Sequence, residues 1–493
     1  MRKRKNAMTK QLLLLLLFLS LSTAIYYLIR RSLARKVFLL AVSWVFYCLC
    51  SLQAFPILLL EILLAFFSSR LFQKYPQHKK PLLILDLLLV LGTLSLYKYL
   101  GFVAASCAGL FRLLALLALP PVTLPAIAVP IGISFFSFVI CGYLIDVYRG
   151  DTEPETDFVT FALYVSFFPV ILSGPIERSN NLLRQMKSLP EYSPFRLREG
   201  ICRILIGLGK KLLIADHLAV LVNTAFGAPE NFTALELLLC ACCYSLQIYC
   251  DFSAYSDIAI GGGKLLGFEL LENFSQPYFS RTIKDFWRSW HKSLTGWFKD
   301  YLYIPLGGSR KGRLRTYLNI LIVFAVSGLW HGAAWTFVIW GVINGCYQIL
   351  GDATLRARKR LHSALRLRED SVLLTLWQIV FCFALSTLAW IFFRADSLPQ
   401  ALFYIRSLVT LRGGLHCSLR ALGMSFRQSA ALCVWLLLLL QFDMRSGKKD
   451  LVRAISNRPN LCWVLCTALI FLMIIFGAYG QGYDPQDFVY FKF

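Results

Sequence analysis

The run Gln11–Ile29 reads QLLLLLLFLSLSTAIYYLI, and its composition decides the fold class of the chain. A helix that crosses the hydrocarbon core of a bilayer needs about 20 residues of this kind. Three further runs, 37–67, 81–96 and 461–476, are as rich in Leu, Ile, Val and Phe. No run shows the period-two alternation of a membrane β-barrel. The sequence therefore predicts an all-α, polytopic membrane protein.

The composition of the whole chain agrees with this fold class. Of its 493 residues, 57% are hydrophobic and 16% are charged, and the mean hydropathy is +0.61. Soluble domains are about a quarter charged. The basic start MRKRKNAMTK, the apolar run and the small residue Ala24 resemble a signal peptide. The apolar run continues to Ile29 and many spans follow, so we expect an uncleaved first span.

The apolar segments predict about 11–13 crossings, some of them re-entrant or interfacial, in one transmembrane domain over 1–493. They are 11–29, 37–52, 54–70, 82–100, 127–147, 157–173, 201–222, 234–258, 316–330, 333–350, 372–393, 429–442 and 461–479. Neither an internal repeat nor a low-complexity linker is visible. Basic residues flank the first span on both sides, so charge leaves the side of the N-terminus open.

The charge balance favours anionic partners. Lys and Arg total 51 against 27 Asp and Glu, which gives a net charge of +24. In a membrane protein this surplus first indicates cytoplasmic loops that face anionic lipid. It also suits a nucleotide cofactor or an acidic carrier protein. Nucleic acid is not expected as a partner, because the basic residues are scattered between spans.

The cysteines and two buried carboxylates are expected to be structural. Most of the 15 cysteines lie in or beside apolar runs, where Cys acts as a small hydrophobe. No spacing resembles a zinc knuckle, and the histidines do not join the cysteines, so no metal site is predicted. Asp251 and Asp257 lie in an apolar segment, where pairing with buried cations is the expected role.

The stretch 281–301 predicts an interfacial amphipathic helix. On a helical wheel the cations gather on one side and the apolar residues on the other. The cations are Arg281, Lys284, Arg288, Lys292 and Lys299, and the apolar side holds Ile283, Phe286, Trp287, Trp290, Leu294, Trp297, Phe298 and Tyr301. His291 falls near the border, where it could touch a buried cavity. The same pattern also fits a surface helix whose histidine lies at the membrane interface without a functional role.

A basic loop is predicted directly after this helix. The segment YIPLGG from Tyr303 breaks the helix, and SRKGRLR then adds four cations. Such a glycine-containing cationic loop can form a phosphate-binding site. A plain membrane-facing loop is equally compatible with it.

A second histidine, His331, lies within the apolar stretch VSGLWHGAAW that begins at Val326. Ionisable groups at membrane depth are costly, and they usually face a cavity and carry function. Burial disfavours the charged imidazolium, and a neutral imidazole can act as general base toward a hydroxyl nucleophile. A core histidine bonded to a backbone carbonyl is the alternative.

These motifs together resemble the membrane-bound O-acyltransferase family. The resemblance is strongest to its bacterial branch that contains the alginate O-acetyltransferase membrane subunit. The segments that carry it are FWRSWHKSLTGWFKDYLYIPLGGSRKG (286–312), GLWHGAAWTFVIWG (328–341), VPIGISFFSF (129–138), LYVSFFPVILSGPIER (163–178), LQIYCDFSAYSDIAIG (246–261), LGFELLENFSQPYFSRTIKDFW (266–287) and FVYFKF (488–493). The chain departs from the pattern in its basic N-terminal extension and in Cys250.

The resemblance implies a ring of helices with a thin centre, in a bacterial cell membrane. The acyl donor, with acetyl-CoA as the expected molecule, would enter from the cytoplasm. The acetyl group would pass to a partner similar to SGNH-type esterases, which acetylates an exported polysaccharide. His331 matches the family's catalytic base and His291 its second polar site residue. No bound cofactor is expected.

The expected site is therefore a set of catalytic and donor-binding residues, with its core motifs within 129–350. Beside His331 and His291, the donor-binding candidates are Asn273, Trp287, Arg288, Trp290, Tyr301, Arg310, Lys311, Trp330 and Trp335. The aromatic tail 481–493 is expected to pack into the helical ring or to dock the partner.

Two other functions remain open. One is D-alanyl transfer to teichoic acid from an acidic carrier protein. The other is a non-catalytic glycan or lipid transporter, which would be expected to show repeated halves. The polysaccharide is not specified by the sequence.

Overall fold

The computed structural model describes residues 2–113, 129–365, 368, 371–446 and 450–478. Within these ranges all regular structure is helical, which confirms the predicted fold class. The tail expected to pack or dock, 481–493, lies outside the described residues.

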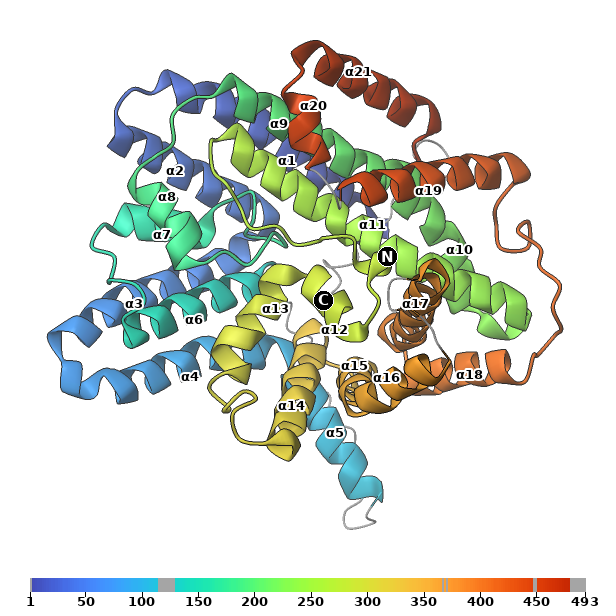
Figure 1. The fold of residues 1–493 in the computed structure, drawn as a ribbon. Helices are drawn as coiled ribbons and strands as arrows, with labels where there is room; N and C mark the ends of the chain where they lie inside the picture. The colour runs from blue at the N-terminus through green and yellow to red at the C-terminus, as the bar shows by residue number, and fades with distance from the viewer. Residues whose placement is uncertain (1, 114–128, 366–367, 369–370, 447–449, 479–493) are drawn as a thin grey trace.

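The helices form a consecutive series along the chain (Figure 1). The first are α1 (Arg2–Leu28), α2 (Ser32–Ser51), α3 (Phe55–Lys74), α4 (Lys79–Lys98), α5 (Leu100–Leu113), α6 (Ile133–Arg149), α7 (Phe158–Ser166) and α8 (Arg184–Lys187). The middle ones are α9 (Pro194–Gly209), α10 (Asp216–Gly227), α11 (Ala234–Leu265), α12 (Ile283–Ser289), α13 (Lys292–Phe298), α14 (Arg313–His331), α15 (Trp335–Ala353) and α16 (Leu355–Ala364). The last are α17 (Val372–Arg394), α18 (Leu398–Val409), α19 (Phe426–Ser446), α20 (Leu451–Ser456) and α21 (Pro459–Phe476).

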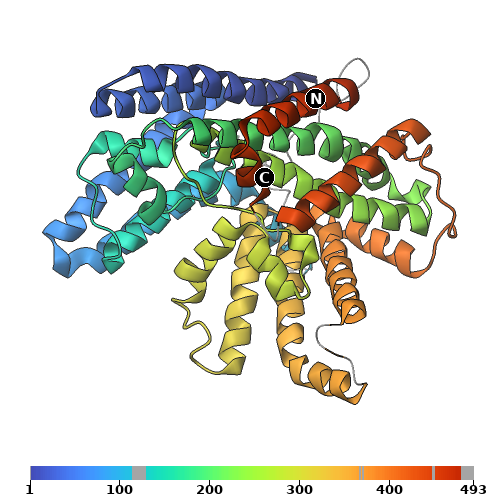
Figure 2. The ribbon, with the colours of Figure 1, turned by 45° about the horizontal axis from the view of Figure 1, so that its top comes forward.

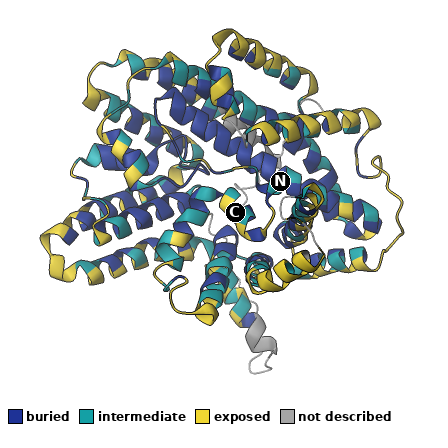
Figure 3. Ribbon diagram, viewed as in Figure 1, coloured by how far each residue is buried: buried dark blue, intermediate teal, exposed yellow. Residues whose placement is uncertain are grey.

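The short helices α12 and α13 lie at the centre of the molecule, with longer helices on every side (Figure 1). In a view turned by 45°, helices α14 to α17 extend away from the layer that holds α1, α9 and α21 (Figure 2). The long helix α11 is buried along most of its length, whereas outer helices expose one face (Figure 3). Those outer faces carry large apolar side chains such as Leu373, which is 80% exposed. An apolar outer face is what contact with lipid requires.

The described residues include full-length apolar spans and shorter helices, as expected of a fold with re-entrant or interfacial segments, and one stretch, Ser32–Lys74, holds both α2 and α3. Seven stretches of the described residues are long and apolar enough to cross a membrane. They are Ser32–Lys74, Pro76–Lys98, Ala234–Leu265, Arg313–His331, Val372–Arg394, Phe426–Ser446 and Pro459–Phe476. The predicted span 157–173 is wrong, because α7 ends at Ser166 after 9 residues. Its run is apolar because it is buried against other protein segments: every residue from Thr160 to Ile176 is buried.

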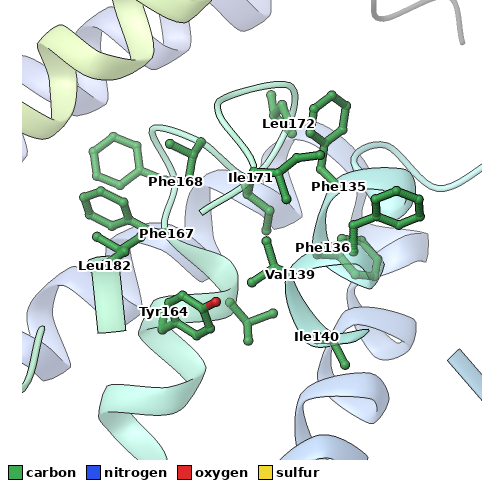
Figure 4. Close-up of a cluster of buried hydrophobic side chains, with 14 of the residues drawn as sticks. Phe135, Phe136, Val139, Ile140, Tyr164, Phe167, Phe168, Ile171, Leu172 and Leu182 are labelled. Atoms are coloured by element: carbon green, nitrogen blue, oxygen red, sulfur yellow. The ribbon is translucent and has the colours of Figure 1, made fainter. Parts of the chain in front are cut away.

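The apolar cluster beneath this segment fixes α6 in place (Figure 4). Aromatic and aliphatic side chains of α6 pack against α7 and the turns that follow it. The labelled members are Phe135, Phe136, Val139, Ile140, Tyr164, Phe167, Phe168, Ile171, Leu172 and Leu182. Because α6 is held on this side, its first turn, with Ser134, is presented toward the centre of the molecule.

Buried ion pairs join α11 to the helical segment before it, as predicted. Asp257 accepts from Arg203 Nε at 2.6 Å and from Lys210 Nζ at 2.9 Å. Asp251 lies 2.7 Å from the ammonium of Lys211. Both lysines lie in a π-helical turn, Lys210–Ala215, which joins α9 to α10. The two carboxylates therefore hold α11 against α9 and α10.

The pair α14 and α15 packs backbone against backbone at two glycines. A Cβ atom at Gly328 of α14 would collide with the carbonyl oxygen of Phe337, and one at Gly341 of α15 with that of Phe324. We call this contact the glycine seam. It places the C-terminal end of α14, with His331, beside α15.

Candidate active site

The stretch predicted as one amphipathic helix is broken at its histidine. Thr282 caps α12, its hydroxyl accepting from the backbone N–H of Asp285 at 3.1 Å. After Ser289, Trp290 is extended and His291 has φ +43° and ψ 54°, the left-handed region. Only then does α13 begin. The prediction of one continuous helix is therefore wrong, because side-chain periodicity carries no information on a single residue with left-handed backbone angles.

The separation of apolar and cationic residues predicted by the helical wheel is nevertheless present in the structure. Phe286, Trp290 and Trp297 are buried, whereas Arg281 and Lys284 are exposed. His291 is not at the border, since only 1% of its surface is exposed. The left-handed turn carries its ring inward, away from the water-facing side.

Asn273 surrounds the His291 turn with hydrogen bonds. Its Oδ1 lies 3.1 Å from His291 Nδ1 and accepts from the Ser293 hydroxyl at 2.7 Å. Its backbone oxygen accepts from the N–H of Lys292 at 2.9 Å. Its Nδ2 donates to Ser256 Oγ of α11 at 3.3 Å. Asn273 is fully buried, so this network ties the turn to α11 in a water-poor setting.

The His291 ring is neutral at physiological pH. Burial lowers the pKa of His291 to about 3. The edge of Phe252 lies against it at 4.7 Å between ring centroids. A neutral ring can accept a proton or polarise a carbonyl group.

His331 ends α14 inside an aromatic box. It is 2% exposed, and its ring centroid lies 4.9 Å from Trp330, 5.1 Å from Trp340 and 5.2 Å from Phe393. The burial expected of His331 is confirmed. Its role as general base stays a prediction.

Trp330 connects the two histidines. Its ring is 6.0 Å from His291 as well as 4.9 Å from His331. Its indole N–H donates to the Ser134 carbonyl at 3.4 Å, and its own carbonyl accepts from Lys98 Nζ at 2.5 Å. The fold thus brings together two histidines separated by forty positions in the sequence.

The other predicted donor-binding residues divide into two groups. Trp287 lies 5.6 Å from Trp340, and Trp290 lies 5.0 Å from Trp390, so both belong to the aromatic surroundings of His331. Trp335 is 54% exposed and packs on Phe102, outside that box.

The remaining candidates are peripheral. Tyr301 donates to Asp146 at 2.6 Å and lies under the Arg178 guanidinium. Arg288 is exposed beside Asp285, and Arg310 and Lys311 are exposed in the loop before α14. None of these four candidates is among the ring neighbours or hydrogen-bond partners described for the two histidines.

Several residues of the site were missed from the sequence. They are Lys98, Ser134, Ser293, Trp340, Trp390 and Phe393. Lys98 carried a usable signal, because it is a lone cation that follows the apolar run of α4. The aromatic residues carried none, since the chain is 15% aromatic throughout.

A polar cavity of about 260 Å³ borders the Asn273 network. Asn273 and Ser256 form part of its wall. Its charged lining consists of Arg203, Lys210, Asp257, Glu272, Asp443 and Asp450.

One group of cysteines has metal-ligand geometry. Cys202 of α9 and Cys462 and Cys466 of α21 place their sulfur atoms within 4.8 Å of one another. The distances are compatible with three-thiolate coordination, whereas apolar neighbours such as Val452 fit the interpretation of small hydrophobes. Sequence spacing could not reveal the group, because Cys202 is remote from the other two. It is separate from both histidines.

Comparison with known proteins assigns the chain to a family. Residues 154–397, which contain both histidines, match the model of the membrane-bound O-acyltransferase family. The chain is 33% identical to "Probable alginate O-acetylase AlgI" of Pseudomonas putida over 97% of its own length and 98% of that protein. It is 30% identical to "Peptidoglycan O-acetyltransferase" of Helicobacter pylori over 93% and 91%. Its match to "Teichoic acid D-alanyltransferase" of Bacillus subtilis, at 29%, covers 44% and 58%.

Proposed function

The chain belongs to the membrane-bound O-acyltransferase family, and from this premise we propose that it transfers acetyl groups for the O-acetylation of a cell-surface or exported polysaccharide. The observation that carries the proposal is the pair of buried histidines on either side of Trp330, in a chain similar along nearly its whole length to an alginate O-acetylase. The membrane would be the plasma membrane of a bacterium, since these relatives come from bacteria.

The proposed chemistry is acyl transfer from a thioester to a hydroxyl group. A ring nitrogen of His331 takes the hydroxyl proton while the hydroxyl oxygen attacks the thioester carbonyl carbon. The C–S bond breaks, the thiolate leaves, and the proton on His331 can pass to that sulfur. Charge is thereby balanced, and the oxygen ester is released with the free thiol.

The neighbours of His331 suit this role. Trp330, Trp340 and Phe393 exclude water, which protects a thioester from hydrolysis. His291 is held by Asn273 and is neutral, so it can orient or polarise the thioester carbonyl without competing as a cation.

We propose acetyl-CoA as the donor and a partner similar to SGNH-type esterases as the acceptor that completes glycan acetylation. The exposed cations Arg310, Lys311, Arg313 and Arg315 could contact the donor's phosphates. The shorter and weaker match to D-alanyltransferases favours acetyl over D-alanyl transfer.

The proposal is tested in cells that lack this chain and are complemented with wild type or His331→Ala. Ester-linked acetate is measured in the extracted surface polysaccharide. We expect wild type, and not the variant, to restore it. Restoration of ester-linked D-alanine by the wild type, without acetate, would establish the teichoic-acid alternative. No change in any ester would contradict acyl transfer.

A further inference from the structure

Lys98 is a cation at the end of α4 that the acyl-transfer scheme leaves unused. Its ammonium donates to the backbone oxygen of Trp330 at 2.5 Å and to Ser134 Oγ at 3.3 Å. It also lies 5.7 Å from the centroid of the Trp330 ring. Among the described residues, no carboxylate forms an ion pair with it. A partly buried lysine without a counter-charge is costly at membrane depth, and such residues usually have a function.

The carbonyl that Lys98 contacts belongs to the unsatisfied end of a helix. In the last turn of α14, Gly328 still accepts from the N–H of Gly332. Gly332 is extended, so the helix stops and Trp330 has lost the backbone N–H that would have bonded its carbonyl. Lys98 supplies a donor from another helix in its place.

The same ammonium joins three elements around the site. Ser134 opens α6, and its backbone oxygen accepts from the Trp330 indole at 3.4 Å. Lys98 therefore holds Trp330 by its carbonyl, while Ser134 holds the same residue by its side chain. Trp330 precedes His331 directly, so both contacts act on the turn that carries the imidazole.

We propose that Lys98 is a positioning residue for acyl transfer, which clamps the C-terminal turn of α14 so that His331 meets the reacting groups. The inference rests on the proposed function. A long, flexible side chain with three donors suits this task, since it can reach the carbonyl from a neighbouring helix. Loss of the clamp should lower the rate of the chemical step with little change in donor binding, because Lys98 is not a donor-binding candidate and the Trp330 side chain keeps its bond to Ser134.

The test uses vesicles from the membranes of cells that make the full-length chain, its esterase-like partner and the polysaccharide, with radiolabelled acetyl-CoA at varied concentrations. Label in polysaccharide ester is measured per mole of chain. Lys98→Met removes the donor and the charge, Lys98→Gln keeps a neutral donor, and Lys98→Arg keeps both. Lys80→Met, at the exposed other end of α4, is the matched control.

We expect Lys98→Met to lower kcat about 10- to 100-fold, as a small misplacement of a catalytic group does. KM for acetyl-CoA should stay within about twofold, in line with intact donor binding. Lys98→Arg should recover most of the rate, and Lys80→Met should match wild type. If Lys98→Met does not accumulate, Lys98→Gln takes its place in the same comparison.

A kcat within twofold of wild type for Lys98→Met, or for Lys98→Gln where it takes the place of Lys98→Met, would overturn the proposal. A loss confined to the amount of protein or to KM would overturn it as well. Failure of the proposed function gives a different result, because wild-type vesicles would then form no labelled ester.

Discussion

Oδ1 of Asn273 lies 3.1 Å from Nδ1 of His291, and the same oxygen accepts the hydroxyl of Ser293 two residues later. One amide group thus spans the left-handed turn that turns the histidine inward. The ring, the turn and α11 are consequently one hydrogen-bonded unit. This relationship gives the first of the predictions that follow.

Asn273→Ala should impair both activity and stability. It removes the partner of Ser293 and of the His291 ring, and an unsatisfied buried polar group costs about 1–3 kcal/mol. We expect a lower melting temperature and about a tenfold or greater loss of acetyl transfer. Asn181→Ala is the control, because its side-chain amide donates to Glu177 and to the Glu269 carbonyl and to neither the His291 turn nor Ser293 in the bonds described. Equal loss of transfer in both variants would mean that Asn273 acts only through folding.

Substitutions of His291 should separate backbone strain from loss of the imidazole. His291 has φ +43°, a region that Asn and Gly adopt more readily than Ala. We expect His291→Asn to accumulate at wild-type levels and to transfer acetyl groups poorly. His291→Ala should lose activity and be less stable than His291→Asn by about 1 kcal/mol. Wild-type turnover by His291→Asn would rule out a direct role for the ring.

His331→Ala should abolish most of the transfer while the protein still inserts. Removal of a general base costs about 10²–10⁴-fold. His331→Gln, which fills more of the aromatic box, serves as the control for the cavity. Ester formation per mole of protein is the measurement. Activity of either variant near the wild-type level would refute the general-base assignment.

Replacement of Arg310, Lys311, Arg313 and Arg315 with Gln should raise the acetyl-CoA concentration needed for half-maximal transfer. An increase of about tenfold corresponds to 1.4 kcal/mol. In the wild type, added salt should have a similar effect, since these side chains are exposed. The matched control replaces Arg356, Lys359 and Arg360 on α16. Unchanged donor dependence together with altered membrane orientation would identify the loop as a topological anchor.

Asp257→Ala should be among the most destabilising single changes in α11. It leaves Arg203 and Lys210 buried with their shared carboxylate removed, and breaking such a pair costs about 3–5 kcal/mol. Asp285→Ala removes a partly exposed carboxylate that pairs with Arg288 and accepts from the Thr282 hydroxyl, and it should cost about 1 kcal/mol or less. Thermal unfolding in detergent compares the two. Similar melting temperatures would show that the buried network contributes little.

The burial of the site could be predicted from the sequence better than its geometry. Apolar runs and the depth of His331 were visible, because composition determines both membrane insertion and the cost of burial. The inward turn at His291 was not, since it depends on one backbone dihedral angle supported by Asn273 from another segment. Lys98 was visible as a lone cation at the end of an apolar run, but its contact could not be predicted, because its partner is a carbonyl group, which every residue possesses. The false span at 157–173 arose because burial in protein and burial in lipid select the same side chains.

The glycine seam between α14 and α15 bears on how the enzyme can move. With Gly328 against the Phe337 carbonyl and Gly341 against that of Phe324, the two backbones lie too close for either helix to slide by one residue. A larger side chain brought to either position would meet a peptide oxygen. We expect α14 and α15 to behave as one rigid body during turnover. Substrate exchange, on the microsecond-to-millisecond scale of helix displacements, would then have to open the site along other helices.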